Sequence, residues 1–455
     1  MTRHFFYSAI LLSCALFCGA QAKIVNKVSH EKMLNRFLSY VNIESQSIED
    51  NANTFQVTEG QKEIARLIYN EVNGLGGKNV KVTLSDNYYV YIDIASNMKS
   101  APSVLFMAHM DTSPDAPGVG IKPIVHRNYD GKDLNLPSGI TLSPNDPGRE
   151  HLKDLKGKTI VTSGGNTLLG ADDKTGCAVL VSMVEELINN PKFKHGRVMV
   201  VLSQNEETGL AAIGYDPSVF GEKPDVAVDI DGGNYGSFSI ANFTAVVHTY
   251  KFKGNNVHPG HAKKGHYGDA LTAACYFVGQ IPPSIHPSER DGEDGYIHCY
   301  EVDNPVDKNG KNIKTEYVVK VRLRYFDKKE GDYQKRLLAN NLTKTQKAFP
   351  NVEISKINDE NLYDNIAYAL PSFLPKIIEK ATLEAGIPLK PEMKRGGTTA
   401  SLILARFPND IPGAPGLYSG QQSIHSQYEW ACIDELLLLV NACENLITEL
   451  AGKYK

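Results

Sequence analysis

Three short apolar runs in this chain are each followed by acidic or histidine side chains. The runs and the residues that follow them are 104–108 before His109, 198–202 before Glu206 and Glu207, and 226–230 before Asp231. Apolar runs of this length, bounded by turn signals, indicate buried strands. Open α/β sheets build their sites at the carboxyl ends of such strands, so these side chains are expected to lie together. Oxygen and nitrogen ligands in that position indicate a metal centre, and a metal centre indicates hydrolysis.

Length and composition set the outer limits of the fold. A chain of 455 residues predicts two or three domains. Its hydrophobic fraction of 42% and its charged fraction of 22% are typical of a soluble globular protein. The 48 basic and 52 acidic residues nearly balance and form no basic run, which argues against nucleic acid as a partner. The cysteines form no C-x-x-C pair, so a zinc site built on thiolates is not expected.

The N-terminus differs in composition from the rest of the chain. Arg3 precedes an apolar run over residues 5–17, and an A-x-A-like sequence follows and ends at Ala22. This order is typical of a secretory signal peptide, and the run is too short to span a bilayer. The pattern predicts a cleaved signal peptide over residues 1–22 and an exported protein, periplasmic or secreted. Processing as a lipoprotein at Cys14 is the alternative.

The order of the predicted elements divides the mature chain. Residues 104–231 alternate between strands, loops and a helix, which favours an α/β fold with a mainly parallel sheet flanked by helices. Residues 242–358 follow the order β-α-β-β-α-β of a ferredoxin-like unit, and they contain none of the metal-type clusters. We therefore interpret them as an inserted domain between a first part of the catalytic domain, 23–241, and a second part, 359–455.

Further residues could join the same centre. Asp111 follows His109 at a spacing that suits a carboxylate supporting a metal-bound imidazole. Asp172 lies between a strand-like run and a helix, where it could be an ordinary helix N-cap or a carboxylate that bridges two cations. His425, four residues before Glu429, is by itself more typical of a surface or core histidine than of a ligand.

The two adjacent glutamates are the most informative pair. Glu206 and Glu207 lie on a loop and point in different directions, so that one could bind a metal while the other faces the substrate. The structural alternatives are a solvated acidic loop for this pair and an ordinary Asp-Gly turn for Asp231. As a set, these His, Asp and Glu residues without a thiolate suit a catalytic zinc pair with a glutamate as general base. That inventory is typical of metal-assisted amide hydrolysis.

Seven motifs make the chain similar to a known family. They are His109–Asp115 (HMDTSPD), Thr167–Lys174 (TLLGADDK), Glu206–Gly209 (EETG), Asp231–Gly233 (DGG), Asn255–Gly260 (NNVHPG), Arg395–Thr398 (RGGT) and His425-x-x-x-Glu429. With these motifs the chain resembles, over nearly all of its mature length, peptidase T. This is the tripeptide aminopeptidase branch of the two-zinc exopeptidase family that includes aminoacylases, succinyl-diaminopimelate desuccinylase and glutamate carboxypeptidases. The resemblance implies a zinc-exopeptidase-like fold in which the inserted domain serves as a lid and for dimerisation.

The resemblance also implies a role for each residue of the centre. His109 and Asp231 would hold one Zn²⁺, Glu207 and His425 would hold the second, and Asp172 would bridge the two.

The resemblance assigns the proton transfers and the substrate contacts as well. Glu206 would be the general base toward the metal-bridging water and would later protonate the leaving amine. Asp111 would orient His109. The residues implied in substrate binding are His258, Arg395 and Arg324. In the family the histidine often reaches the site from the partner subunit, and the guanidinium of Arg395 suits a carboxylate.

These inferences predict a zinc-dependent aminopeptidase that acts on short peptides, tripeptides above all, as a homodimer without a membrane span. The alternatives are another amidohydrolase of the same scaffold, either an N-acyl amino acid deacylase or a carboxypeptidase, and a catalytically inactive peptide-binding protein. Three features depart from the family pattern. Thr399 and Asn205 stand where the branch usually has Asp, and the apparent leader is unexpected because relatives are usually cytoplasmic.

Overall fold

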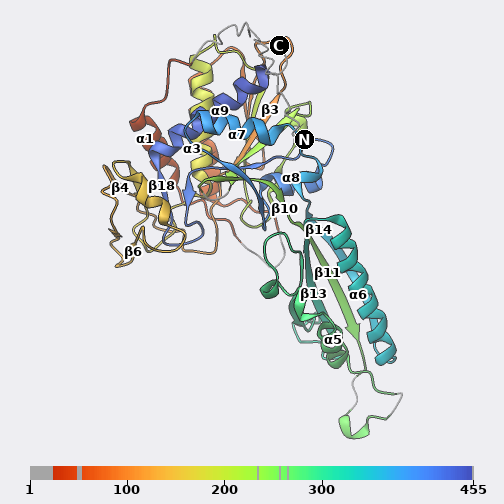
Figure 1. The fold of residues 1–455 in the computed structure, drawn as a ribbon. Coiled ribbons are helices and arrows are strands. Elements are labelled where there is room, and N and C mark those ends of the chain that lie inside the picture. Colours follow the sequence, from red (N-terminus) through yellow and green to blue (C-terminus); the bar gives the residue numbers. More distant parts are fainter. Residues whose placement is uncertain (1–23, 49–53, 233–234, 256–257, 264–265, 453–455) are drawn as a thin grey trace, which may run out of the picture.

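The computed structural model describes residues 24–48, 54–232, 235–255, 258–263 and 266–452. Its main body is built around an eight-stranded sheet (Figure 1). In spatial order the strands are β1 (Val80–Leu84), β2 (Val90–Ile94), β8 (Val198–Ser203), β3 (Val104–His109), β9 (Val226–Gly232), β16 (Gly416–Tyr418), β10 (Ser237–Asn242) and β15 (Lys390–Lys394). The central strands β8, β3, β9 and β16 run parallel, as predicted, and antiparallel pairings lie on either side of them.

Helices cover both faces of this sheet. One face packs against α1 (His30–Val41), α2 (Glu59–Leu75), α3 (Ala171–Asn189), α7 (Leu374–Glu384) and α9 (Ile433–Gly452). The other face packs against α4 (Ala211–Gly214) and α8 (Thr399–Arg406). The start of α2 shows how the sequence fixes these elements: the Thr58 hydroxyl accepts from the Gln61 amide and the Gln61 side chain accepts from the Thr58 amide, which satisfies two donors at the helix end.

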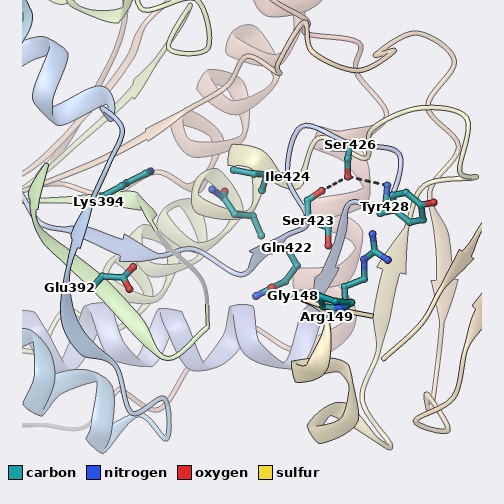
Figure 2. Close-up of a pocket in the computed structure, with 11 residues that line it drawn as sticks. Gly148, Arg149, Glu392, Lys394, Gln422, Ser423, Ile424, Ser426 and Tyr428 are labelled. Atoms are coloured by element: carbon teal, nitrogen blue, oxygen red, sulfur yellow. Dashed lines mark hydrogen bonds between the residues drawn. The ribbon is translucent and has the colours of Figure 1, made fainter. Parts of the chain in front are cut away.

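A second, smaller sheet lies beside the main one. It has the order β17 (Gln421–Gln422), β18 (Trp430–Cys432), β7 (Ile160–Thr162) and β4 (Ile124–His126), and next to it lie the pair β5 (Leu134–Asn135) and β6 (Thr141–Leu142) and the 3-10 helix η1 (Glu150–Leu155). The pairing of β18 with β7 joins two segments that are far apart in the sequence. The loop between β17 and β18 lines a cavity together with the end of β15 (Figure 2).

The predicted inserted unit forms a separate arm that projects from the main body (Figure 1). Its elements follow the chain as β11 (Thr244–Lys253), α5 (Ala270–Gly279), β12 (Tyr296–Asp303), β13 (Glu316–Tyr325), α6 (Lys328–Ala348) and β14 (Glu353–Tyr363). The antiparallel sheet has the order β12-β13-β11-β14, and α5 and α6 share a hydrophobic core with it. The predicted β-α-β-β-α-β fold is therefore confirmed, whereas the domain boundaries, the lid function and the homodimer stay predictions.

Short 3-10 helices complete the description. They are η2 (Pro217–Val219), η3 (Pro259–His261), η4 (Pro283–Ile285), η5 (Pro287–Glu289) and η6 (Ile366–Tyr368). Within the described ranges, no helix combines the length and the apolar character that crossing a membrane requires.

The sheet that positions the metal-type residues depends on a fully buried central strand. Phe106 in β3 is 0% exposed and belongs to the main core. We expect Phe106→Ala to lower the free energy of unfolding by about 3–5 kcal/mol, because a large cavity opens beneath the sheet. Chemical denaturation followed by circular dichroism would measure the change. The control Lys81→Ala, at an exposed position of the edge strand β1, should stay within about 0.5 kcal/mol of the parent; an equal effect of both changes would contradict the expectation.

Candidate metal centre

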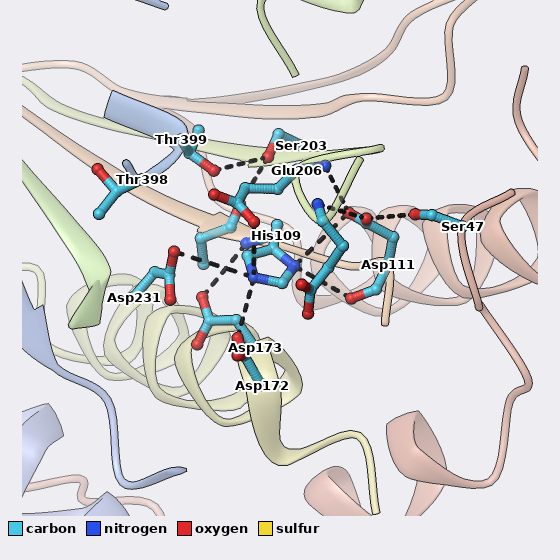
Figure 3. A network of polar contacts seen from close by, with 12 residues as sticks. Ser47, His109, Asp111, Asp172, Asp173, Ser203, Glu206, Asp231, Thr398 and Thr399 are labelled. Atoms are coloured by element: carbon cyan, nitrogen blue, oxygen red, sulfur yellow. Dashed lines mark hydrogen bonds and ion pairs between the residues drawn. The ribbon is translucent and has the colours of Figure 1, made fainter. Parts of the chain in front are cut away.

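The metal-type side chains meet at the carboxyl ends of the central strands, and Figure 3 labels His109, Asp172, Glu206 and Asp231 among them. His109 is the last residue of β3, Asp231 is the next to last of β9, and the Glu206–Glu207 pair follows β8. This is the convergence that the apolar runs predicted. The two remaining predicted ligands arrive from elsewhere: Asp172 lies at the start of α3, and His425 lies in the loop between β17 and β18.

One group of potential ligands is fully buried. His109 Nε2 lies 3.1 Å from Asp172 Oδ1 and 3.9 Å from Asp231 Oδ2. The three ligand atoms of this group lie within 4.8 Å of one another. They therefore face a common point that a single cation could occupy.

A second group lies next to the first and is more open. His425 Nε2 lies 2.9 Å from Glu207 Oε2 and 3.3 Å from Asp172 Oδ2. Asp172 thus offers one carboxylate oxygen to each group, which is the arrangement expected of a bridging ligand. The His425 side chain is 35% exposed, so this second point is the one accessible from solvent.

The residues present fit a pair of divalent cations. Two ligands bound tetrahedrally at zinc–ligand distances of about 2.0–2.2 Å lie roughly 3.3 Å apart, and the separations in both groups are of that order. The groups also concentrate carboxylates in a buried space, and Glu207 Oε1 is buried with no hydrogen-bond partner among the described residues. Buried carboxylates need compensating charge, which bound cations supply.

The two histidines show how strongly the site attracts positive charge. Burial alone would lower the pKa of His109, but hydrogen bonds with Asp111 and Asp172 outweigh it and raise the pKa well above its ordinary value. Burial would also lower the pKa of His425, but the contacts with Asp172 and Glu207 outweigh it and raise that pKa to about 11. In the metal-free protein both imidazoles would therefore be in the doubly protonated, positively charged form at neutral pH.

Glu206 lies beside the ligands without belonging to either group. Its Oε2 is 3.8 Å from His109 Nε2 (Figure 3). Burial, reinforced by Asp231 and Glu207, raises the pKa of Glu206 well above its ordinary value although His109 opposes it. A carboxylate with this environment has an affinity for protons, as a general base requires.

Asp111 supports both the histidine and the glutamate pair. Its backbone carbonyl lies 3.0 Å from His109 Nδ1, and its carboxylate lies 3.5 Å from the same nitrogen. The carboxylate also accepts the backbone N–H groups of Glu206 and Glu207, each at 3.2 Å, and the hydroxyl of Ser47. It is therefore placed to hold the orientation of His109 and the turn that presents the two glutamates.

The residues predicted to bind substrate contact other parts of the chain. Arg395 Nη1 donates to the Gly292 carbonyl at 2.9 Å, and the guanidinium lies over the Phe243 ring at 5.1 Å. Arg324 is 8% exposed and donates to the Leu323 carbonyl at 3.0 Å.

His258 is exposed and directly precedes η3, in the segment of the arm between β11 and α5. Among the described residues, none of the three makes a hydrogen bond or ion pair with the metal-type groups. Their roles in substrate binding stay predictions.

Sequence reasoning missed the contacts of two carboxylates that fix the ligands, those of Glu429 and Asp115. The Glu429 carboxylate accepts the backbone N–H groups of Leu169, Gly170 and Asp172 at 2.6, 2.7 and 2.9 Å, and so fixes the loop that presents Asp172. Asp115 Oδ2 lies 2.9 Å from His425 Nδ1. Both carboxylates belong to motifs noted in the sequence, but spacing alone does not reveal what a carboxylate contacts.

Thr399 and Asn205, two of the three departures from the family pattern, both make side-chain hydrogen bonds. The Thr399 hydroxyl lies 3.3 Å from that of Ser203, and both side chains are buried. The Asn205 side chain accepts from Gln61 and donates to the Gln56 carbonyl, each at 2.8 Å. Neither substitution removes a residue from the two groups.

Comparison with known proteins identifies the family. A peptidase T from Clostridium perfringens is 33% identical over 427 residues, which cover 93% of this chain and 100% of the relative. The chain belongs to the peptidase T family. A peptidase T from Geobacillus kaustophilus is 32% identical over 413 residues, covering 90% of this chain and 95% of the relative. No family model matches the chain.

Solved structures share the fold. The aminopeptidase PepT of Bacillus cereus has a TM-score of 0.68 at 18% identity and covers 93% of this chain and 99% of its own. A tripeptidase of Staphylococcus aureus has a TM-score of 0.67 at 18% identity with the same coverage. A dinuclear metal-binding peptidase of the M20 family from Bacillus subtilis has a TM-score of 0.59 at 11% identity and covers 93% of this chain and 98% of its own. The predicted zinc-exopeptidase-like architecture is confirmed.

Family membership defines the general activity. The chain is a metallo-aminopeptidase, hence an exopeptidase that binds metal and acts on peptides. The alternative of a peptide-binding protein without catalysis is not supported.

The predicted export of the protein is wrong. Peptidase T relatives are cytoplasmic enzymes, and they match this chain over nine-tenths of its length. The prediction depended on the composition of a short segment, residues 1–22, which lies outside the described residues. A basic residue, a brief apolar run and small residues form a generic pattern, and the relationship over the rest of the chain outweighs it. The lipoprotein alternative is set aside for the same reason.

The raised pKa values of the two histidines lead to a prediction about metal binding. Because His109 and His425 carry protons at neutral pH in the metal-free protein, a cation must displace those protons, and affinity should rise with pH. Each proton released raises the affinity about tenfold per pH unit between about pH 6 and about pH 8. Calorimetric titration of metal-free protein with zinc, in buffers of different ionisation enthalpy and at several pH values, measures the affinity and the number of protons released. Affinity independent of pH, with no proton release, would be the contrary result.

Proposed function

We propose that this enzyme is a zinc-dependent aminopeptidase that releases the N-terminal residue of short peptides, tripeptides above all. The observation that carries the proposal is the carboxylate of Asp172 shared between two ligand groups, with Glu206 beside them, in a chain of the peptidase T family. The name tripeptidase belongs to a structural neighbour from Staphylococcus aureus and supports the preferred length.

The donor set favours zinc. One group offers an imidazole and two carboxylates, the other offers the same set, and the two share a carboxylate. Nitrogen and oxygen ligands without thiolates suit catalytic zinc, whereas thiolates dominate structural zinc sites. His109 and Asp231 would hold one ion, Glu207 and His425 the other, and Asp172 both.

The protein residues divide the remaining work. When bound, the two zinc ions would polarise the scissile carbonyl and lower the pKa of a water molecule at the centre. Glu206 would take a proton from the attacking water on its carboxylate and give it to the departing amine. Asp111 would keep the ring of His109 in place through its carbonyl and carboxylate.

The experiment that tests this function compares matched substrates. Metal-replete protein should hydrolyse a panel of tripeptides with free N-termini, and acetylation of the N-terminus should abolish hydrolysis because an aminopeptidase needs the free amine. Product analysis by mass spectrometry should show loss of the first residue. Hydrolysis of N-acyl amino acids without hydrolysis of any peptide would instead indicate a deacylase on the same scaffold.

The role proposed for Glu206 has its own test. Glu206→Gln keeps the shape of the side chain but removes its ability to accept a proton, so turnover should fall at least about a hundredfold. Zinc content measured by atomic emission should stay near that of the parent, because Glu206 belongs to neither ligand group. A parallel loss of zinc would show that Glu206 acts as a ligand and not as a base.

A further inference from the structure

A cavity of about 570 Å³ opens beside the metal centre (Figure 2). One wall is the loop of residues 421–428, which also carries His425, and the opposite wall is the end of β15 with Glu392 and Lys394. Gln421 links the cavity to the centre, because its side-chain amide donates to Asp231 Oδ1 at 3.2 Å. Cavities of this size accommodate small ligands, which include short peptides.

Lys394, the last residue of β15, points into this space (Figure 2). Among the residues that the structure describes, its ammonium makes no hydrogen bond and no ion pair. Burial would lower the pKa of Lys394, but Asp231, Glu206 and other carboxylates raise it, so the side chain is charged at neutral pH. An ammonium has three donors, and here none of them is used by a described neighbour.

The other charged side chains of the cavity differ from Lys394. Arg149 Nη1 already donates to Asp146 Oδ2 at 2.6 Å, and its guanidinium lies over the Tyr428 ring at 4.1 Å. Glu392 is exposed and makes no ion pair with Lys394, although the two residues are on the same face of the strand. Of the two basic side chains that line the cavity, Lys394 is therefore the one without a direct partner among the described residues.

The carboxylates that attract Lys394 are those that bound cations would neutralise. Asp231 and Asp172 belong to the ligand groups, and both contribute to the field at Lys394. With cations in place, that field weakens and the ammonium is left to interact with whatever enters the cavity. A negatively charged group of the substrate satisfies its donors best.

We propose that Lys394 binds a carboxylate of the peptide substrate in this cavity. The inference rests on the proposed function and adds to it the charge that the site recognises. Two sources carry the same group, the C-terminal carboxylate of a short peptide and the acidic side chain of one of its residues. A C-terminal source would also explain a preference for tripeptides, because a cavity of fixed size places that carboxylate at a fixed distance from the scissile bond.

Binding measurements on an inactive background separate recognition from turnover. In Glu206→Gln protein loaded with zinc, calorimetry compares trialanine, trialanine amide and an aspartate-containing tripeptide amide. Trialanine that binds at least about tenfold more tightly than trialanine amide identifies the C-terminal carboxylate as the group that Lys394 binds. An aspartate-containing tripeptide amide that binds more tightly than trialanine amide identifies the acidic side chain instead. Adding Lys394→Met should abolish whichever preference is seen, while Lys394→Arg should retain part of it.

Controls make the outcome decisive. Lys390→Met, at an exposed position of the same strand, should leave affinities and zinc content unchanged. Equal binding of all three peptides, or an equal loss for all of them in Lys394→Met, would overturn the proposal, because Lys394 would then only balance the charge of the centre. The proposed function fails separately, if active protein cleaves no free tripeptide.

Discussion

The shared carboxylate of Asp172 is the interaction on which the centre depends. It is the residue through which a histidine from the main sheet and a histidine from the small sheet meet, at 3.1 Å and 3.3 Å from its two oxygens. The position of Asp172 is itself fixed in two ways: Glu429 accepts its backbone N–H, and α3 continues from it into the core. Without this bridge the two ligand groups would share no residue, since one is anchored at β3 and β9, and the other joins Glu207 from the loop after β8 to His425 from the loop between β17 and β18.

The part of the site built on regular strands could be predicted from the sequence. His109, Asp231 and the Glu206–Glu207 pair follow apolar runs, and the geometry of parallel strands brings such positions to one edge. Asp172 and His425 could not be placed in this way. They lie at a helix start and in a loop between very short strands, so the sequence raised them only as candidates with structural alternatives, and the resemblance to a family assigned them as ligands. The order of elements in the arm was also predictable, because each element there is long and well bounded.

Predictions of substrate contacts were weaker for a physical reason. Guanidinium chemistry suggests a carboxylate partner for Arg395 and Arg324, but a guanidinium satisfies carbonyl groups and aromatic faces equally well. In the structure both arginines have carbonyl partners, and both lie over aromatic rings. Lys394 carries no motif that distinguishes it, and its significance emerges only from the cavity and from the lack of a direct partner among its described neighbours.

The pairing of β18 with β7 has a consequence for how the enzyme matures. The loop that carries His425 ends at β18 (Trp430–Cys432), and β18 pairs with Ile160–Thr162, a strand made far earlier in the chain. Ribosomes synthesise proteins from the N-terminus, so the ligands up to Asp231 emerge long before this last one. A nascent chain could therefore bring His109, Asp172 and Asp231 together early, whereas the second ligand group, which includes His425, would have to wait until residues 430–432 have been made.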